Sequence, residues 1–483
     1  MNVIKNFLYN VGYQVLIIIV PLILAPYISR VVGPDGVGTY SYTYSIVTLF
    51  GLFANLGMAK YGNREISKCG DDREKRTQVF SELLSVKLSC SIIVLAVYLC
   101  FVEISGGEYT TALFIQIFNL LSFMLDISWF FWGMQEFRIT TAVCAAFNII
   151  SIFFIFSFVK TENDVGIYIF ILAFRAFLIQ LTPWIFVPRY ADVRMSWRHI
   201  MGRHWKSLLL LFFPVFAKYL YSMMDRIMLG NMVGITEVGY YENVQSITLT
   251  AVTVLTAAGD VVMPRMTLLY DRKEMKKAGE LFHGVFHLVS FLAVGIMFGF
   301  IAVADDFIPW FYGDKFESCI LLLRMIAPVV LFAGYSDLVR NVFLLPRYMD
   351  KEYVIALLSG AAVNFVINYA LIGRFGSAGA IVGTVCAEMI VMIIQLWFVR
   401  NEFKMPRFFR QAIIYCLLGS TILIPCHLIG RLDLDPAAGV ILDILTGGGL
   451  YTAVVFIYLY FAERNVLRTI RSMMPGQNRK TQI

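Results

Sequence analysis

The sequence predicts an all-α integral membrane protein with about 14 transmembrane helices. Of its 483 residues, 59% are hydrophobic and only 15% are charged, and the mean hydropathy is +0.72. A soluble protein of this size would carry about 25% charged residues. Apolar runs of about 20 residues recur along the whole chain, and each is long enough to cross a bilayer as a helix. The polar stretches between these runs are no larger than loops, so we expect no soluble domain.

The apolar runs can be justified in order along the chain. The first, 7–30, is too long for the apolar part of a cleaved signal peptide and lacks a small-residue cleavage site, so we expect it to be the first membrane helix. The other helices are expected at 38–60, 78–102, 110–133, 139–159, 165–187, 206–230, 238–263, 280–304, 317–345, 353–372, 378–399, 411–429 and 438–461.

Lysine and arginine are distributed unequally between the loops, and this predicts the orientation of the chain. With the N-terminus in the cytoplasm, 29 of the 40 Lys and Arg residues fall in cytoplasmic segments and only 5 in outer segments. Cytoplasmic loops of membrane proteins carry such an excess. We therefore expect both termini in the cytoplasm. The basic rim accounts for the net charge of +7 and would attract anionic lipid headgroups of the phospholipid bilayer. Nucleic acid is not expected as a partner, because no polar domain carries a basic face.

A short glycine pattern, V-G-x-x-x-V-G-x-Y, occurs twice, at 32–40 and 233–241. Each copy lies in the predicted outer loop that follows the first helix of a six-helix block. Because six is even, the two blocks have the same orientation, which predicts a parallel repeat. We expect two six-helix lobes at 1–190 and 191–402, related by a pseudo-two-fold axis along the membrane normal, and two C-terminal helices at 403–483.

Prolines interrupt several of the predicted helices. They are Pro21, Pro26, Pro183, Pro214, Pro328 and Pro425. Each removes a backbone hydrogen bond and permits a bend. Bends in the first helix of each block suit a transporter that rocks between two states, whereas for any one proline a fixed kink that serves packing is an equal alternative.

Ionisable side chains within the apolar runs are candidates for a functional site, because each costs about 2.5–3.5 kcal/mol at the centre of a membrane helix. The cations are Lys87, Arg175, Lys218, Arg226, Arg324 and Arg340, and the acids are Asp126, Asp225, Asp260, Asp337 and Glu388. For each residue alone, pairing that locks helices together is the alternative to ligand binding. Taken together, the cations favour a cavity that receives an anion, and we select Lys218, Asp225, Arg226 and Arg340 as candidate lining residues.

Three further cations stand at the ends of predicted helices. Lys60 and Arg64 lie one turn apart at the cytoplasmic end of 38–60. They are candidates for the mouth of the cavity, and ordinary enrichment of positive charge on the inside is the alternative. Arg30 lies at the outer end of 7–30, against that rule, where it reaches outer phosphates or points into the cavity.

Enzymatic and metal chemistry are not expected. No G-x-x-x-x-G-K-[ST] loop is present, so the chain does not hydrolyse a nucleotide by that route. No outer loop is large enough for the catalytic domain of a membrane glycosyltransferase. The eight cysteines contain no C-x-x-C pair and the five histidines are not grouped in the sequence, so we expect no metal site and no cofactor.

The stretch LDISWFFWGMQEFR, residues 125–138, places an acid between a long uncharged run and two tryptophans. Asp126, Trp129, Gly133 and Glu136 are spaced 3, 4 and 3, so they form one stripe on a helix. This stretch, together with PLILAPYISRVVGPDGVGTYSYTYSIV and LGMAKYGNREISK, resembles bacterial polysaccharide flippases of the O-antigen exporter type. These belong to the multidrug and oligosaccharidyl-lipid/polysaccharide exporter superfamily. The resemblance extends from about residue 5 to about residue 140, and more loosely beyond.

The resemblance implies two six-helix lobes around a cationic central cavity and alternating-access transport of undecaprenyl-diphosphate-linked oligosaccharide, an O-antigen or capsule-type unit, across the bacterial inner membrane. H⁺ or Na⁺ is the candidate coupling ion, and a polysaccharide polymerase and a chain-length regulator are candidate partners. Asp126 and Trp129 would bind sugar. The alternative for Asp126 is a bond to a neighbouring helix, and the alternative for the tryptophans is the interfacial aromatic belt, which we favour for Trp132. A cation-coupled multidrug exporter of the same fold and a polytopic glycosyltransferase are the alternative functions.

Overall fold

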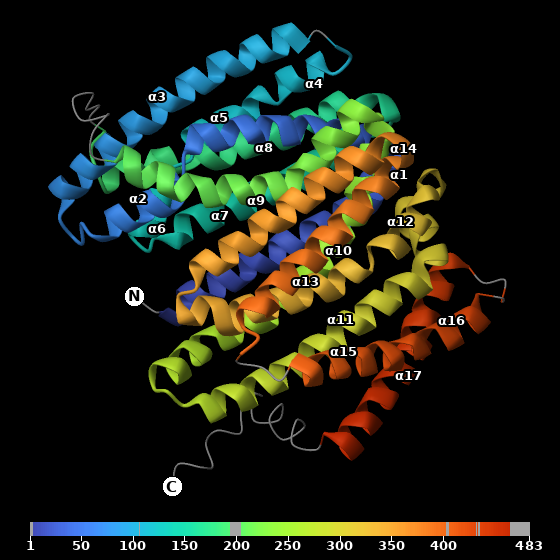
Figure 1. The fold of residues 1–483 in the computed structure, drawn as a ribbon. Helices are drawn as coiled ribbons and strands as arrows, with labels where there is room; N and C mark the ends of the chain where they lie inside the picture. The colour runs from blue at the N-terminus through green and yellow to red at the C-terminus, as the bar shows by residue number, and fades with distance from the viewer. Residues whose placement is uncertain are drawn as a thin grey trace. The chain divides into compact units, whose positions relative to one another are not determined.

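Every regular element that the structure describes is helical (Figure 1). The structure is a computed structural model, and it describes residues 3–105, 107–193, 204–401, 405–430, 432 and 435–463. Within these residues, 12 helical stretches are long and apolar enough to cross a membrane. The predicted all-α membrane fold is therefore confirmed. Several predicted basic residues, namely Arg194, Arg198, Arg203, Lys404 and those from Arg464 onward, lie outside the described residues.

Each of the fourteen predicted segments falls on an observed helix, but two pairs are joined. Helix α1 (Val3–Asn55) contains the predicted helices 7–30 and most of 38–60, and α14 (Asp350–Phe398) contains 353–372 and 378–399. An unbroken helix of 53 residues would be about 80 Å long, far more than the roughly 30 Å of a bilayer core. Both helices are instead kinked, α1 at Gly33 (φ 68°, ψ −176°) and α14 at Gly376 (φ 55°, ψ −134°). A total of fourteen crossings stays a prediction.

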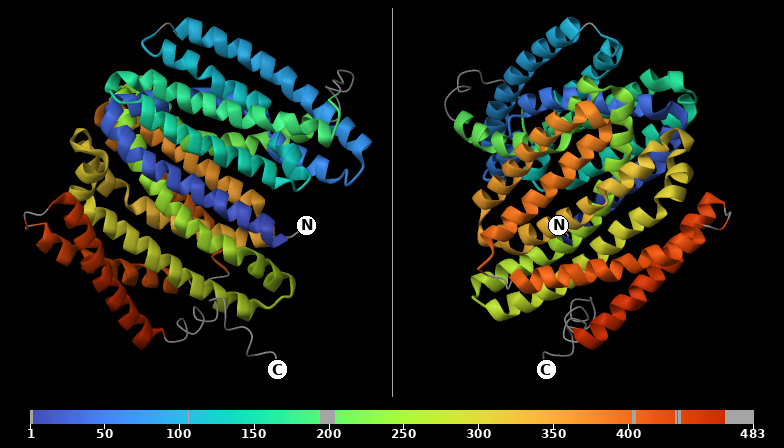
Figure 2. Two further views of the ribbon diagram at one scale, coloured as in Figure 1. Left: turned by 180° about the vertical axis from the view of Figure 1, so that it is seen from behind. Right: turned by 45° about the vertical axis from the view of Figure 1, so that its right-hand side comes forward.

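The chain forms two compact units, Met1–Gly239 and Tyr240–Ile483. In the first unit, α1 contacts α3, α5, α7 and α9, α5 packs along α8, and α2 packs on α6 (Figures 1 and 2). The elements of this unit after α1 are α2 (Met58–Ser67), α3 (Arg73–Ser105), α4 (Thr110–Ile115), α5 (Ile117–Leu125), α6 (Ser128–Gly133), α7 (Phe137–Phe158), η1 (Glu162–Asp164), α8 (Val165–Leu181), η2 (Thr182–Arg189) and α9 (Trp205–Met232).

The second unit is built around α11 (Met275–Tyr312), which contacts α12, α13, α15, α16 and α17. Its core includes Phe286, Tyr335, Leu338, Tyr415 and Tyr451, all nearly inaccessible. The other elements are α10 (Ile235–Asp271), which begins in the last residues of the first unit, η4 (Asp314–Phe316), α12 (Ser318–Ile326), α13 (Pro328–Val339), η5 (Arg340–Leu344), η6 (Leu345–Arg347), α14, α15 (Met405–Gly419), η7 (Ser420–Ile422), α16 (Leu423–Ile429) and α17 (Pro436–Ala462).

The predicted lobe boundaries were placed by the sequence repeat, and they differ from the boundary between the two compact units. Helix α9, the first helix of the second predicted block, belongs to the first compact unit. The predicted boundaries at 190/191 and 402/403 therefore stay predictions.

The two copies of the glycine pattern contact each other reciprocally, within the first unit. A Cβ atom on Gly38 would come within 2.0 Å of the main-chain oxygen of Ile235, and one on Gly239 would come within 2.0 Å of the main-chain oxygen of Pro34. Gly38 and Gly239 occupy matched places in the pattern, and so do Pro34 and Ile235. A contact in which each copy presents the same atoms to the other is what a two-fold relation between the loops requires.

The first glycines of the pattern share an unusual backbone conformation. Gly33 and Gly234 have φ angles of 68° and 142°, where a residue with a side chain is strained. Between the loops, Thr236 Oγ1 donates a hydrogen bond to Asp35 Oδ1 at 2.5 Å. At both places the pattern thus puts a glycine where the backbone has a positive φ.

Two of the predicted proline bends coincide with observed helix ends. Helix α8 ends at Leu181, and Pro183 lies in the first turn of the 3₁₀ segment η2 that follows. Helix α12 ends at Ile326, and Pro328 is the first residue of α13. At these positions the missing N–H falls at a helix start, where it has no intrahelical acceptor in any case.

Helix α3 changes character along its length. Its first half buries the polar side chains of Glu82, Ser85 and Lys87, whereas Ile93 and Ile104 in its second half are 65% and 86% exposed. An apolar, exposed half suits contact with lipid chains, and the buried polar half lies against the rest of the unit. This buried half supports the candidate site.

Candidate functional site

Helices α2 and α6 form the frame of the candidate site, at the predicted cytoplasmic end of the first unit. Trp129 on α6 is 1% exposed. A Cβ on Gly62 of α2 would come within 2.4 Å of its ring, and a Cβ on Gly133 would come within 2.7 Å of Ile66 Cβ. Glycine at both positions lets the two helices approach closely. Of the four residues of the predicted stripe, Trp129 and Gly133 lie on α6 against α2, whereas Asp126 and Glu136 lie outside this helix.

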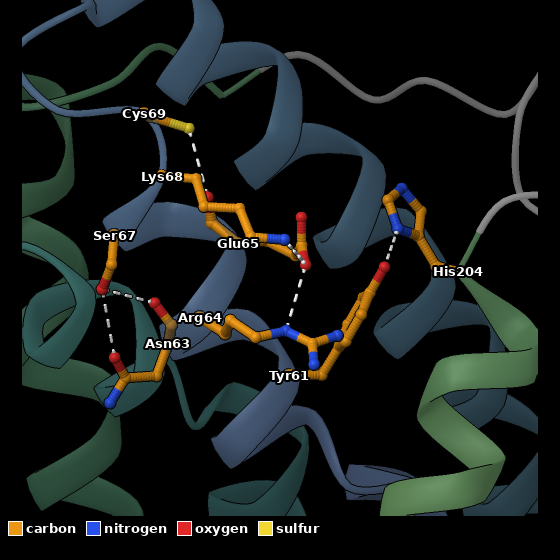
Figure 3. Close-up of polar contacts among 8 residues, drawn as sticks. All are labelled: Tyr61, Asn63, Arg64, Glu65, Ser67, Lys68, Cys69 and His204. Atoms are coloured by element: carbon orange, nitrogen blue, oxygen red, sulfur yellow. Dashed lines mark hydrogen bonds and ion pairs between the residues drawn. The ribbon is translucent and has the colours of Figure 1, made fainter.

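Helix α2 presents a group of cations around Glu65 (Figure 3). Arg64 Nε lies 3.3 Å from Glu65 Oε1, and Lys68 Nζ lies 2.9 Å from the same oxygen. The Arg64 guanidinium also lies 5.3 Å from the centre of the Tyr61 ring. Lys60 is exposed and has no hydrogen-bond partner among the described residues. Exposed ion pairs contribute about 0–1 kcal/mol, so these cations can exchange partners with an anionic ligand at little cost.

Asp126 lies between α5 and α6 and closes a turn. Its Oδ1 accepts a hydrogen bond from the Ser128 main-chain N–H at 2.9 Å and another from the Ser128 hydroxyl. The carboxylate therefore holds the first turn of α6, as Asp does at helix starts. The predicted span 110–133 is long and apolar enough to cross a membrane, but this turn divides it by separating α5 from α6. The role of Asp126 as a sugar ligand stays a prediction.

Lys87 fixes the other side of this turn. Its Nζ donates to the main-chain oxygen of Asp126 and to Asn55 Oδ1, the latter at 2.7 Å. Lys87 is 1% exposed, so its charge is held inside the first unit by oxygen acceptors from α1 and from the α5–α6 turn. The sequence identified Lys87 as a buried cation but did not identify these acceptors.

A buried network of hydrogen-bonded side chains connects α2 to its neighbours. Tyr61 Oη and His204 Nδ1 are 2.7 Å apart, and His204 Nε2 lies 2.9 Å from Glu82 Oε2 (the Tyr61–His204 contact is drawn in Figure 3). Gln78 Nε2 donates to Glu82 Oε1 at 2.9 Å. This hydrogen-bond network joins α2, α3 and the residue that precedes α9. Sequence reasoning missed it, although an acid at position 82, inside the predicted helix 78–102, was an available signal.

The three candidates on α9 are in different environments. Lys218 is exposed and has no hydrogen-bond partner within the described part of the chain, whereas Asp225 and Arg226 are 2% and 5% exposed. Arg226 Nη1 donates to the Ser222 main-chain oxygen at 2.6 Å. Arg30, in α1, is also exposed and lies three residues before the kink at Gly33.

Arg340 lies in the second unit, where α13 passes into the π-helical turn η5. Its Nη1 forms an ion pair with Asp337 Oδ1 at 2.7 Å, and its Nε donates to Asn341 Oδ1 at 3.1 Å. Asn341 Nδ2 in turn donates to Asp260 Oδ1 at 2.9 Å. For Arg340 the structure thus shows the pairing that was the alternative to anion binding, and a π-turn of this kind is often found at functional sites. Binding of an anion by Arg340 stays a prediction.

The family model described as "Polysaccharide biosynthesis protein" matches residues 3–269, more than half of the chain. The chain belongs to this family. Among its relatives, "Putative O-antigen transporter" of Escherichia coli (strain K12) is 23% identical over 413 residues, which cover 82% of this chain and 97% of the relative. "Capsular polysaccharide biosynthesis protein CapF" of Staphylococcus aureus is 19% identical over 83% of this chain and 100% of the relative. The resemblance seen in the sequence is therefore confirmed.

Solved structures share the fold. "Lipid II flippase MurJ, inward closed conformation" has a TM-score of 0.72 and 17% identity, covering 94% of this chain and 99% of that one. An inward-facing multidrug resistance transporter of the MATE family has a TM-score of 0.62 and 13% identity, covering 79% and 93%. The named relatives and neighbours include transporters and a flippase, which confirms the prediction of a transporter rather than an enzyme.

Proposed function

We propose that this chain is a flippase that moves undecaprenyl-diphosphate-linked oligosaccharide, an O-antigen or capsule-type unit, from the cytoplasmic to the outer leaflet of the bacterial inner membrane. The observation that carries the proposal is the similarity to the E. coli O-antigen relative, which spans 97% of that protein rather than one motif. Membership of the polysaccharide biosynthesis protein family and the flippase fold support it. Both termini are placed in the cytoplasm by the distribution of Lys and Arg.

The chemistry of such a substrate matches the candidate residues. A diphosphate is doubly charged and gains most from Lys and Arg side chains that are not already committed to a buried acid. Lys60 and Lys218 meet this condition among the described residues, and Arg64 is held by a partly exposed ion pair with Glu65 and by the Tyr61 ring. The proposed substrate-binding residues are Arg30, Lys60, Arg64, Asp126, Trp129, Lys218, Asp225, Arg226 and Arg340.

Trp129 has a polar atom that a sugar could bind in a state in which the contact between α2 and α6 is open. Its buried Nε1 has no hydrogen-bond partner in the part of the chain that the structure describes. A buried N–H without a partner is uncommon in proteins, and a sugar hydroxyl would provide the missing acceptor. H⁺ or Na⁺ as the coupling ion, alternating access through a cationic cavity, and a polymerase and a chain-length regulator as partners belong to the same proposal.

The test is flipping by the purified full-length protein in vesicles that contain a fluorescent lipid-linked oligosaccharide, with the label quenched from outside. We expect flipping by the wild type. The variant Lys60→Ala with Lys218→Ala should be slower by about tenfold or more, since one lost contact to a charged group is worth about 1.5–3 kcal/mol. Lys276→Ala, which removes an exposed cation from the predicted cytoplasmic end of α11, is the matched control. Export of cationic drugs without any flipping would contradict the proposal.

A further inference from the structure

Three side chains with metal-binding atoms meet in the second unit. His283 and His287 lie four residues apart on α11, and Glu463 is the residue that follows α17. One donor atom from each lies within 4.8 Å of the other two, and His283 Nε2 is 3.5 Å from Glu463 Oε2. His287 is 1% exposed, so the group lies at the boundary between the protein interior and its predicted cytoplasmic surface.

This donor set is the kind that binds zinc. Two histidines four residues apart present both rings on one face of a helix, and a carboxylate from another segment completes a set of three protein ligands. Tetrahedral zinc with ligand distances near 2.0–2.1 Å holds its donor atoms roughly 3.3 Å apart. The His283–Glu463 separation of 3.5 Å is close to this spacing, and the donor atom of His287 lies within 4.8 Å of both, so a bound metal would have to draw it closer.

Neighbouring side chains orient two of the three ligands. His287 Nδ1 lies 2.8 Å from Tyr415 Oη, which leaves Nε2 as the nitrogen for the metal. Gln411 Nε2 donates to Glu463 Oε1 at 3.1 Å, which leaves Oε2 on the side of His283. Histidines and carboxylates that ligate metals are usually held by such a second hydrogen bond, because it fixes the ring nitrogen and the orientation. Tyr415 and Gln411 both come from α15, so three helices contribute to the arrangement.

We propose that His283, His287 and Glu463 bind a divalent transition-metal ion of the zinc class, with water at the fourth position, and that the metal fastens the end of α17 to α11. Nitrogen and carboxylate donors also suit Cu²⁺, Ni²⁺ and Co²⁺, whose affinities follow the usual order for such ligands. Of the proposed substrate-binding residues, only Arg340 lies in the same compact unit as this site. The ungrouped cysteines and histidines predict no metal site, whereas the spacing of four between these two histidines is a sequence signal for one.

The test uses the full-length protein in detergent, stripped with a chelator, incubated with Zn²⁺, desalted and measured for bound zinc. We expect one zinc per chain in the wild type, and loss of that zinc in His283→Ala, in His287→Ala and in Glu463→Gln. His427→Ala, which removes a histidine from α16, is the matched control and should keep the zinc. Tyr415→Phe should keep it with an affinity lowered about 10- to 100-fold.

Two further measurements keep the test decisive if a variant is unstable. Co²⁺ in place of zinc should give the visible absorption of a four-coordinate site in the wild type and not in Glu463→Gln, which keeps the size of the side chain. Zinc should also raise the thermal midpoint of the wild type but not that of His283→Ala. Absence of zinc from folded wild-type protein, or equal zinc in the wild type and in a folded Glu463→Gln variant, would overturn the proposal.

Discussion

The carboxylate of Asp126 accepts two hydrogen bonds from Ser128, while its main-chain oxygen accepts a third from Lys87. One residue therefore starts α6 and receives the charge of a buried lysine. Because α6 carries Trp129, the position of the indole depends on this turn. The sequence stripe contained no information on this turn, since a spacing pattern assumes a continuous helix, and a functional role for these residues stays a prediction.

Two substitutions of Asp126 distinguish a structural role in the turn from a role in ion coupling. Asp126→Asn keeps an oxygen that can accept from Ser128, so we expect a loss of less than about 1 kcal/mol, whereas Asp126→Leu removes both bonds to Ser128 and should lose about 0.5–1.5 kcal/mol per bond and lower flipping. Thermal unfolding in detergent and the vesicle assay measure the two effects. If the Asn variant folds and binds substrate but loses all ion-gradient-driven flipping, Asp126 is instead the coupling residue.

The other candidate residues show which interactions could be predicted from the sequence and which could not. The free energy of placing a charged side chain in a membrane helix can be estimated from the sequence. This energy identified Lys87, Arg226 and Arg340 as candidates for a functional or pairing role. Whether such a charge is offset by a neighbour depends on residues distant in the chain. Asp337 is three residues from Arg340 and could be foreseen as its partner. The acceptor Asn55 is 32 residues from Lys87, and no local pattern relates the two.

At the scale of elements, the contact between α2 and α6 depends on the absence of a side chain at position 62. Trp129 fills the space that a Cβ on Gly62 would occupy. Gly62→Ala should therefore separate the two helices and destabilise the protein by about 1–3 kcal/mol, as overpacking does. Gly279→Ala in α11, where a Cβ would meet nothing within 4 Å, is the control and should be neutral or stabilising.

Thermal midpoints and the yield of monodisperse protein on size-exclusion chromatography measure this comparison. A Gly62→Ala variant that is as stable as Gly279→Ala would mean that the contact of Trp129 with α2 does not position α6.

The two glycine loops provide a second prediction at this scale. Gly38→Ala and Gly239→Ala should each be destabilising by more than about 1–3 kcal/mol, because the atom in the way is a main-chain oxygen that cannot rotate aside. The two variants should have effects of similar size, since their contacts are equivalent. Gly299→Ala, in open space on α11, is the control. A large loss in one loop and none in the other, measured by thermal unfolding, would contradict the reciprocal arrangement.

Most helix positions were predictable from the sequence because length and hydropathy determine them. Three kinds of feature were not. The joining of two predicted helices across Gly33 depends on a backbone angle, and the division of 110–133 depends on the Asp126 turn. The π-helical turn Arg340–Leu344 follows Val339, and no periodicity in the sequence signals it.

At the scale of the whole molecule, the orientation in the membrane can be tested by labelling single introduced cysteines in intact cells. Cysteines at Gly70 and at Arg272 should react only after the membrane is made permeable, and one at Gly107 should react with an impermeant maleimide from outside. All three positions are exposed, so a failure to react cannot be attributed to burial. Labelling of position 272 from outside would contradict the predicted orientation of α10.

The labelling of native cysteines must be measured in the wild-type protein, because the thiol of Cys69 lies beside the introduced cysteine at position 70. Burial raises the pKa of the Cys69 thiol, although Lys75 and Arg76 lower it. At neutral pH the reactive thiolate is therefore scarcer than for an exposed cysteine, and background labelling should be low and increase as the pH rises through the raised pKa.

The reciprocal contact of the two loops also has a meaning for the origin of the chain. Gly38 lies against the main chain of Ile235, and Gly239 lies against the main chain of Pro34. Each loop therefore supplies the glycine of one contact and the main-chain oxygen of the other. Two identical half-length subunits paired about a two-fold axis would make this contact twice from a single glycine codon. A gene duplication that fused them would inherit both sides already matched, and every later substitution at one glycine would be constrained by a partner encoded about two hundred codons away.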